Sequence, residues 1–189
     1  MAGHGVRVIG GEWRGRRLRV PGSARPTLDR AREAIFSALA GAIEGANVLD
    51  LYAGSGAFGI EALSRGAARA VFVDVDRVAI DTIRQNLEIV GATDRADVRL
   101  GAVDAYVRRT PGGPPFDLVF IDAPYATPAE TLASVLGHLD DPAWLGPLAT
   151  VVIERSARSE IPELPATWTV RWSRTYGDTL VTLASGPDV

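Results

Sequence analysis

The 189-residue sequence contains no cysteine, no lysine and only two histidines. Without cysteine there is no disulfide, no thiolate nucleophile and no zinc site built on sulfur. His4 and His138 lie far apart in the sequence, which argues against a histidine metal site and against a Ser-His-Asp triad. We therefore expect carboxylates, hydroxyls, backbone groups or a bound cofactor to carry any chemistry, and we expect no metal.

Long apolar runs are also missing. No window of eighteen apolar residues occurs, and the first residues, MAGHGVRVIGG, lack the apolar centre of a secretory signal. An apolar content of 47% is enough for one sizeable domain with a core. We expect a cytoplasmic protein with no membrane association.

Positive charge is concentrated at the N-terminus. Residues 1–32 carry a net charge of +6, whereas the remainder carries −9, for a total of −3. The stretches 6–11 and 16–21 are typical of a short β-hairpin. The arginines on and around it are Arg7, Arg14, Arg16, Arg17 and Arg19. A basic arm (1–26) on an acidic body (27–189) predicts a polyanionic partner such as RNA, although a charged face turned to solvent is the alternative.

The body alternates helix and strand patterns. A period near 3.6 predicts a first helix over 27–45, with Thr27 as its N-cap. Strands are predicted at 47–52, 69–74, 96–101, 117–122 and 148–154, and helices at 58–66, 76–91, 102–109 and 128–139. Residues 168–185 alternate and turn at YGD, as in an antiparallel hairpin. The fold class is α/β, a doubly wound and mostly parallel sheet.

The stretch LDLYAGSGAFGIEAL has the spacing G-x-G-x-x-G between a predicted strand and a predicted helix. Glycines at this spacing allow a tight turn and let a ligand approach backbone N–H groups at a helix N-terminus. Asp74 ends the next strand, where a carboxylate can accept hydrogen bonds from both ribose hydroxyls. We predict a nucleotide-containing cofactor bound by Gly54, Ser55, Gly56 and Asp74.

Asp50 favours S-adenosylmethionine over NAD as that cofactor. A carboxylate so close to the glycine turn would repel a pyrophosphate, whereas it suits the cationic amino end of S-adenosylmethionine. The chain is also short for a dinucleotide domain with a separate substrate domain. Asp104 and Ala105, after the third strand, are predicted to lie at the adenine. Asp104 could instead be an acid favoured by the dipole at a helix N-terminus.

The stretch VFIDAPYAT ends a buried strand on a carboxylate followed by a proline turn and an aromatic ring. An exocyclic base amine is a poor nucleophile because its lone pair is delocalised into the ring. Asp122 and the Ala123 carbonyl can accept its two N–H hydrogens and direct the lone pair at a methyl donor. Pro124 restricts Ala123 and stiffens the turn, and Tyr125 offers a face on which the base can stack. We predict that these four residues are catalytic.

Together these motifs resemble class I S-adenosylmethionine-dependent methyltransferases with an (Asp/Asn)-Pro-Pro-(Tyr/Phe) turn. The segments RVIGGEWRGRRL, RPTLDRAREAIFSAL, LDLYAGSGAFGIEALSRGA and VFIDAPY resemble, more closely, the RsmD family of 16S rRNA guanine-N2 methyltransferases. The resemblance implies a seven-stranded sheet with a C-terminal antiparallel hairpin. It also implies methylation of one guanine N2, at position 966 of 16S rRNA. The substrate would be an assembled or assembling small ribosomal subunit. It implies that the arginine arm engages RNA. Ala123 stands where the family motif has its first proline.

Three alternatives stay open. The catalytic turn fits adenine N6 or cytosine N4 of DNA equally well, because any flipped base presents an N–H pair. The chain lacks a large target-recognition domain, and exposed rRNA loops suit a small protein better. A non-catalytic RNA-binding module or an NAD-dependent enzyme is less compatible with the acids at 50, 74 and 122. We expect a monomer.

Overall fold

The computed structural model describes residues 6–21 and 29–186 of the chain. Thr27, the predicted N-cap, and the boundary predicted between residues 26 and 27 lie outside these ranges. Within them, every helix is too short or too polar to cross a bilayer.

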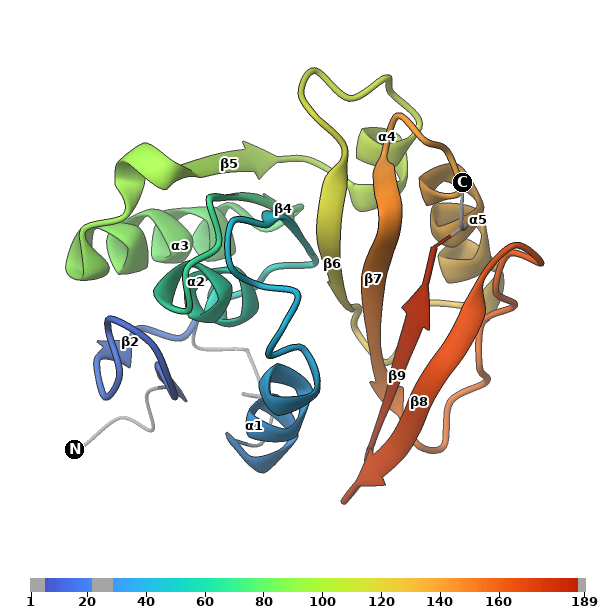
Figure 1. Cartoon of the computed structure of the whole chain (residues 1–189), viewed down its shortest axis with the longest axis horizontal. Helices are drawn as coiled ribbons and strands as arrows, with labels where there is room; N and C mark the ends of the chain where they lie inside the picture. Colours follow the sequence, from blue (N-terminus) through green and yellow to red (C-terminus); the bar gives the residue numbers. More distant parts are fainter. Residues whose placement is uncertain (1–5, 22–28, 187–189) are drawn as a thin grey trace.

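Seven strands form one sheet in the order β5-β4-β3-β6-β7-β9-β8 (Figure 1). Their bounds are β3 (Asn47–Leu51), β4 (Arg69–Asp74), β5 (Ala96–Leu100), β6 (Phe116–Asp122), β7 (Leu145–Ser156), β8 (Thr169–Tyr176) and β9 (Thr179–Ser185). The first five pair in parallel, and β9 pairs antiparallel with both β7 and β8. The predicted fold, a mostly parallel seven-stranded sheet with a C-terminal antiparallel hairpin, is confirmed.

Helices cover both faces of the sheet (Figure 1). Their bounds are α1 (Asp29–Ala38), α2 (Ala57–Ser64), α3 (Arg77–Val90), α4 (Val103–Val107) and α5 (Ala129–Leu139), with a short 3-10 helix η1 (Thr93–Arg95) before β5. One core joins α1, α2 and α3 to the sheet, and a second joins α4 and α5 to the other face. In the first core, Phe120 of β6 stacks on Phe58 at 5.0 Å and contacts Phe36 at 5.5 Å between ring centroids. Burial on both faces explains the continuous apolar runs in the sequence.

Helix α1 is shorter than predicted. It ends at Ala38, and residues 39–46 continue as tight turns with bonds such as Ala42 N–H to the Leu39 carbonyl. Gly41 lies within this segment, and Gly45 has a positive φ of 74°. Leu39 and Ile43 are nevertheless buried, so the apolar pattern that predicted a helix also serves an irregular turn.

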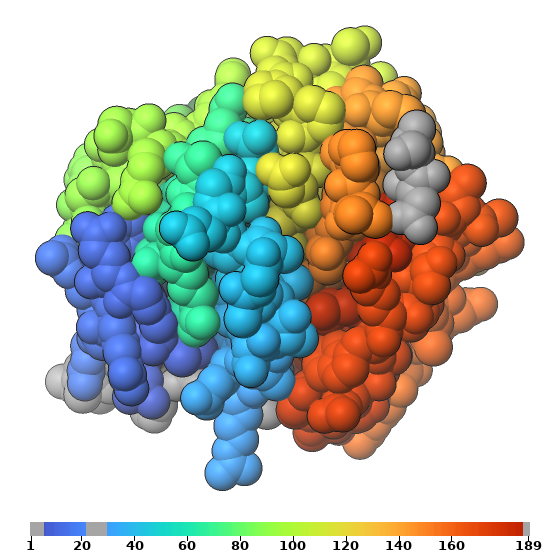
Figure 2. All heavy atoms as spheres, viewed as in Figure 1, coloured from blue at the N-terminus to red at the C-terminus, as the bar shows by residue number. Residues whose placement is uncertain are grey.

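The N-terminal hairpin, β1 (Val6–Arg7) and β2 (Arg17–Leu18), is confirmed, although its strands are shorter than predicted. It lies against α2 and α3 on one side of the molecule (Figures 1 and 2). Trp13, between the two strands, is buried in the first core. The hairpin is therefore packed onto the body rather than projecting freely from it.

Candidate active site

The order of the strands reverses at β3. The chain adds β4 and β5 on one side of β3 and then returns to place β6 on the other side. Ligands of such sheets bind at the carboxyl ends of the strands beside this point. Asp50 is in register with Phe72 of β4 and Phe120 of β6. Asp74 and Asp122 lie two residues beyond those phenylalanines, so the three acids share one edge and one face.

The glycine turn leads directly from β3 into α2. Gly56 is the N-cap of α2, with a φ of 75°, and a Cβ there would come within 3.3 Å of Phe72 and Ile83. Gly54 also has a positive φ, of 55°, but a Cβ there would meet nothing closer than the Tyr52 carbonyl oxygen at 3.9 Å. Gly56 is thus required by backbone conformation and packing, whereas the space beside Gly54 is open to a ligand.

Asp74 fixes this turn. Its Oδ2 accepts a hydrogen bond from the Gly54 N–H at 2.8 Å, and its Oδ1 accepts one from the Asp76 N–H at 2.9 Å. Each carboxylate oxygen keeps a further lone pair. The position is therefore compatible with the predicted ribose contact, while Asp74 also orients the backbone of the glycine turn.

Asp50 is almost completely buried, at 1% exposure. Its Oδ2 accepts a hydrogen bond from the Gly59 N–H at 2.9 Å, and its Oδ1 is buried with no partner in the described part of the chain. Burial raises the pKa of Asp50 well above its ordinary value, the Gly59 bond opposes this, and the charges of Asp122 and Asp74 raise it further. An unpartnered carboxylate oxygen of this kind fits a cationic group of a ligand.

Residues of the predicted adenine side lie at the end of β5. A cavity of about 440 Å³ is lined there by Leu100, Gly101, Ala102 and Ala105, among others. Asp104 forms an ion pair with Arg108 at 3.7 Å, with its side chain partly exposed. Ala105 thus lines the cavity directly, while Asp104 also has the role expected in the first turn of a helix.

The predicted catalytic turn follows β6. Asp122 is half-buried and pairs in register with Glu154 of β7, and Ala123 is buried. The Thr127 N–H donates to the Pro124 carbonyl at 2.8 Å and closes the turn. Tyr125 is 45% exposed, and its hydroxyl lies 3.4 Å from the Thr179 hydroxyl. Its ring is accessible for stacking.

The arginines of the hairpin are all exposed, but two of them contact α3. Arg16 Nη1 donates to the Ile89 carbonyl at 2.5 Å, and Arg19 Nη1 donates to Gln85 Oε1 at 2.7 Å. The backbone carbonyl of Arg7 accepts from Arg32 of α1 at 2.8 Å. The side chains of Arg14 and Arg17 make no hydrogen bond or ion pair within residues 6–21 and 29–186, so they are the arginines most available to a partner.

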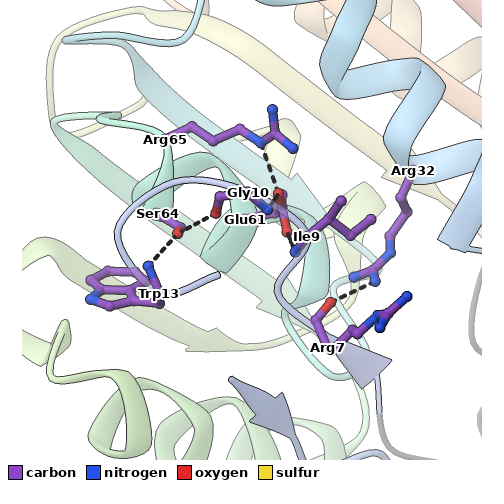
Figure 3. Close-up of polar contacts among 8 residues, drawn as sticks. All are labelled: Arg7, Ile9, Gly10, Trp13, Arg32, Glu61, Ser64 and Arg65. Carbon is purple, nitrogen blue, oxygen red and sulfur yellow. Dashed lines mark hydrogen bonds and ion pairs between the residues drawn. The ribbon is translucent and has the colours of Figure 1, made fainter. Parts of the chain in front are cut away.

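Sequence reasoning missed the polar residues that attach the hairpin (Figure 3). Glu61 of α2 is fully buried and accepts backbone N–H groups of Ile9 and Gly10 at 2.6 and 2.8 Å. Ser64 donates to the Gly10 carbonyl and accepts from the Trp13 N–H. The available signal was a glutamate within the apolar run of this helix, since acids there are buried only when hydrogen-bonded.

Asn86 of α3 is a second residue that sequence reasoning missed. It is fully buried, and its Oδ1 accepts from the Arg19 N–H at 2.7 Å. Its Nδ2 donates to the carbonyls of Arg19 and Ser55, each at 2.9 Å. One side chain thus joins the hairpin to the glycine turn.

The architecture and the three acids at its switch point define a Rossmann-like methyltransferase of class I, the fold class predicted from the sequence. The family follows from comparison. Residues 6–185 match the family model described as Conserved hypothetical protein 95, and the chain belongs to this family. The predicted resemblance to RsmD is confirmed, and the predicted cofactor, S-adenosylmethionine, is confirmed for the class.

Named relatives agree with this placement. The chain is 37% identical over 174 residues to ribosomal RNA small subunit methyltransferase D of Escherichia coli K12, which covers 91% of this chain and 85% of the relative. It is 34% identical over 176 residues to the protein of that name from Haemophilus influenzae, covering 91% and 89%. The solved structure of yhhF from Escherichia coli has a TM-score of 0.86 at 36% identity, covering 98% of this chain and 99% of that chain.

Proposed function

We propose that this protein transfers a methyl group from S-adenosylmethionine to an exocyclic base amine in small-subunit ribosomal RNA. The observation that carries the proposal is the proximity of two acids at neighbouring strand ends. The charge of Asp122 raises the pKa of Asp50, so the turn that suits the acceptor base lies beside the turn that suits the cofactor. The names of the relatives, which are rRNA methyltransferases, support RNA as the substrate.

Seven residues would hold the cofactor, which supplies a methyl group on a positively charged sulfur. Asp50 would bind its cationic amino group, because the buried Oδ1 has no protein partner among the described residues and a cation would favour the ionised carboxylate. The open space beside Gly54 would let the cofactor approach the backbone of the turn that Gly54, Ser55 and Gly56 form. Asp74 would accept from the ribose hydroxyls. Asp104 and Ala105 would flank the adenine at the end of β5.

The turn after β6 would hold the acceptor. The Asp122 carboxylate and the Ala123 carbonyl would each accept a hydrogen bond from one N–H of the amine. The nitrogen lone pair would then be directed at the methyl group. Tyr125 would stack on the base, a contact that contributes about 1–3 kcal/mol in single-stranded complexes. Positioning of this kind lowers a barrier by up to about 7–11 kcal/mol.

We further propose that the amine is guanine N2 at position 966 of 16S rRNA, in an assembled or assembling subunit. This finer assignment is supported by the RsmD motifs, since the turn itself also suits adenine N6 or cytosine N4. Arg7, Arg14, Arg16, Arg17 and Arg19 of the hairpin are proposed to engage the RNA. The protein is proposed to act in the cytoplasm as a monomer.

Methyl transfer to defined acceptors tests the proposal. Small subunits, naked 16S rRNA and duplex DNA would be incubated with labelled S-adenosylmethionine, with rRNA taken from cells that lack the protein. We expect label in rRNA, and mass mapping to locate it on one guanine N2. Label only in DNA would replace the proposal with a DNA methyltransferase, and cofactor binding without transfer to any acceptor would reject the assigned catalytic turn.

A further inference from the structure

Arg155, near the end of β7, is a buried cation in contact with the predicted catalytic turn. It is only 4% exposed. Its Nη2 donates to the Thr127 carbonyl at 3.0 Å, and its Nη1 lies 3.5 Å from the Pro124 carbonyl oxygen. Its Nε is buried without a partner, and the side chain forms no ion pair in the part of the chain that the structure describes. A charged group buried without a counter-charge is unfavourable, so its contacts need an explanation.

The register of β6 and β7 shows from which side Arg155 reaches the turn. Glu154 pairs with Asp122, and side chains alternate along a strand, so Arg155 shares its face with Ile153. Ile153 and Ala123 belong to the core under α4 and α5, whereas Val152 and Phe120 belong to the opposite core. Arg155 therefore supports the turn from the α5 side, while Asp122 lies on the other face.

Two other contacts restrain the turn, the Thr127 N–H bond to the Pro124 carbonyl at 2.8 Å and the Tyr125 hydroxyl 3.4 Å from the Thr179 hydroxyl. Pro124 and Tyr125 are exposed, so packing against the core does not hold them. Pro124 restricts the backbone of Ala123, but the φ of Ala123 is not fixed as a proline would fix it. The planar guanidinium adds a restraint from the buried side, because its Nη2 donates to the Thr127 carbonyl at 3.0 Å while its Nη1 lies 3.5 Å from the Pro124 carbonyl oxygen.

The charge of Arg155 also acts on the hydroxyl of Tyr52, the residue after β3. Burial raises the pKa of the Tyr52 hydroxyl, Asp104 raises it further, and the charge of Arg155 opposes both. Tyr52 directly precedes the glycine turn and has a positive φ of 58°. The hydrogen bonds of Arg155, however, are to the turn after β6.

We propose that Arg155 is a positioning residue for methyl transfer: by binding the Pro124 and Thr127 carbonyls, it holds the turn so that Asp122, the Ala123 carbonyl and the Tyr125 ring meet the base together. The proposal rests on the proposed function of this turn. Arg155 is buried and its hydrogen bonds are to the turn, so we expect it to act on turnover through the turn rather than on binding.

The test compares Arg155→Met and Arg155→Lys with Arg158→Met. Arg158 follows shortly after on the same segment, is 87% exposed and pairs only with Asp178 among the described residues, so its replacement is a matched loss of charge. We expect Arg155→Met to lower kcat about ten- to a hundredfold, with KM for RNA and Kd for S-adenosylmethionine within about twofold of wild type. Arg155→Lys should recover part of kcat, and Arg158→Met should be unaffected.

Amide hydrogen exchange supplies a readout that does not depend on activity. In Arg155→Met, we expect faster exchange only in the turn between Asp122 and Ala129. This result would support the proposal whichever nucleic acid is the methyl acceptor. Unchanged kcat, equal loss in Arg158→Met, or unchanged exchange at the turn would overturn it. Failure of the proposed function is recognised separately, because wild-type protein would then transfer no methyl group to rRNA.

Discussion

Asp122 is the residue on which the proposed reaction depends most directly. Replacing it with alanine removes an acceptor for the amine hydrogens but leaves the glycine turn and Asp74 unchanged. We expect turnover to fall at least about a hundredfold, the lower range for loss of one preorganised group, with near-normal affinity for S-adenosylmethionine. Single-turnover methylation and calorimetry measure the two quantities. Asp94→Ala, at an exposed position of η1, is the control, and full activity in Asp122→Ala would reject the assigned role.

Asp50 makes the stability of the cofactor-free protein depend on pH. Its folded-state pKa lies above the ordinary value of 3.8 because of burial, so its contribution is fully present below that value. The contribution is lost as pH rises through the higher pKa of the folded protein, because the buried carboxyl must then ionise. Asp50→Asn keeps the shape of the side chain and an oxygen that accepts from the Gly59 N–H. Because the amide does not ionise, the variant does not lose stability in this way as pH rises.

We therefore expect cofactor-free Asp50→Asn to melt above wild type at pH 8, and this advantage to shrink towards pH 4. Each kcal/mol corresponds to about 2–4 °C in a chain of this size. Saturating S-adenosylmethionine should raise the melting temperature of wild type more than that of the variant. Parallel melting curves across the pH range would contradict the buried, unpartnered state of this carboxyl.

At the scale of elements, Glu61 determines how the hairpin is attached. Its carboxylate accepts two backbone N–H groups from residues far away in sequence and one bond from Arg65, all within buried or partly buried surroundings. Glu61→Ala would leave these donors unpaired, which in buried networks costs about 3–5 kcal/mol. We expect a marked fall in the denaturation midpoint, whereas Glu88→Ala, exposed on α3, should change it little. A midpoint near wild type in Glu61→Ala would show that water replaces the carboxylate.

The same hydrogen bonds show what the sequence could and could not predict. Strands such as β4 were predicted at the residues observed. Their signals, apolar runs and nearby glycines, lie within a few residues of the strand itself. The acids at 50, 74 and 122 were predicted as a site because each lies at or next to the carboxyl end of a parallel strand, and such ends meet at one edge. The bonds of Glu61 and Asn86 join segments more than thirty residues apart, so no local pattern indicated their partners. The contact of Arg155 with the turn depends on the pairing of β6 with β7, which periodicity does not define.

At the scale of the whole molecule, the predicted RNA arm and the cofactor turn belong to one hydrogen-bonded unit. Asn86 binds the backbone of Arg19 on one side and the Ser55 carbonyl on the other. Phe58 and Trp13, from α2 and the hairpin, share the first core. A displacement of the hairpin by bound RNA would therefore be transmitted to the glycine turn through the buried side chain of Asn86.

The structure separates four of the five hairpin arginines into two pairs with different expected roles. Arg14 and Arg17 are exposed without partners in the described residues, whereas Arg16 and Arg19 bind α3. Arg14→Gln with Arg17→Gln should weaken RNA binding without changing thermal stability. It should also reduce the slope of log K against log salt by about 0.7–0.9 for each phosphate that the protein no longer neutralises.

Binding titrations at several salt concentrations measure this slope. The control removes the same charge from Arg84 and Arg171, which are exposed on α3 and β8. Arg16→Gln with Arg19→Gln should lower stability as well as affinity, because both side chains bond α3 from the hairpin. If the Arg14 and Arg17 variant keeps the wild-type slope, RNA does not bind this face of the hairpin. Arg16 and Arg19 would still attach the hairpin to α3.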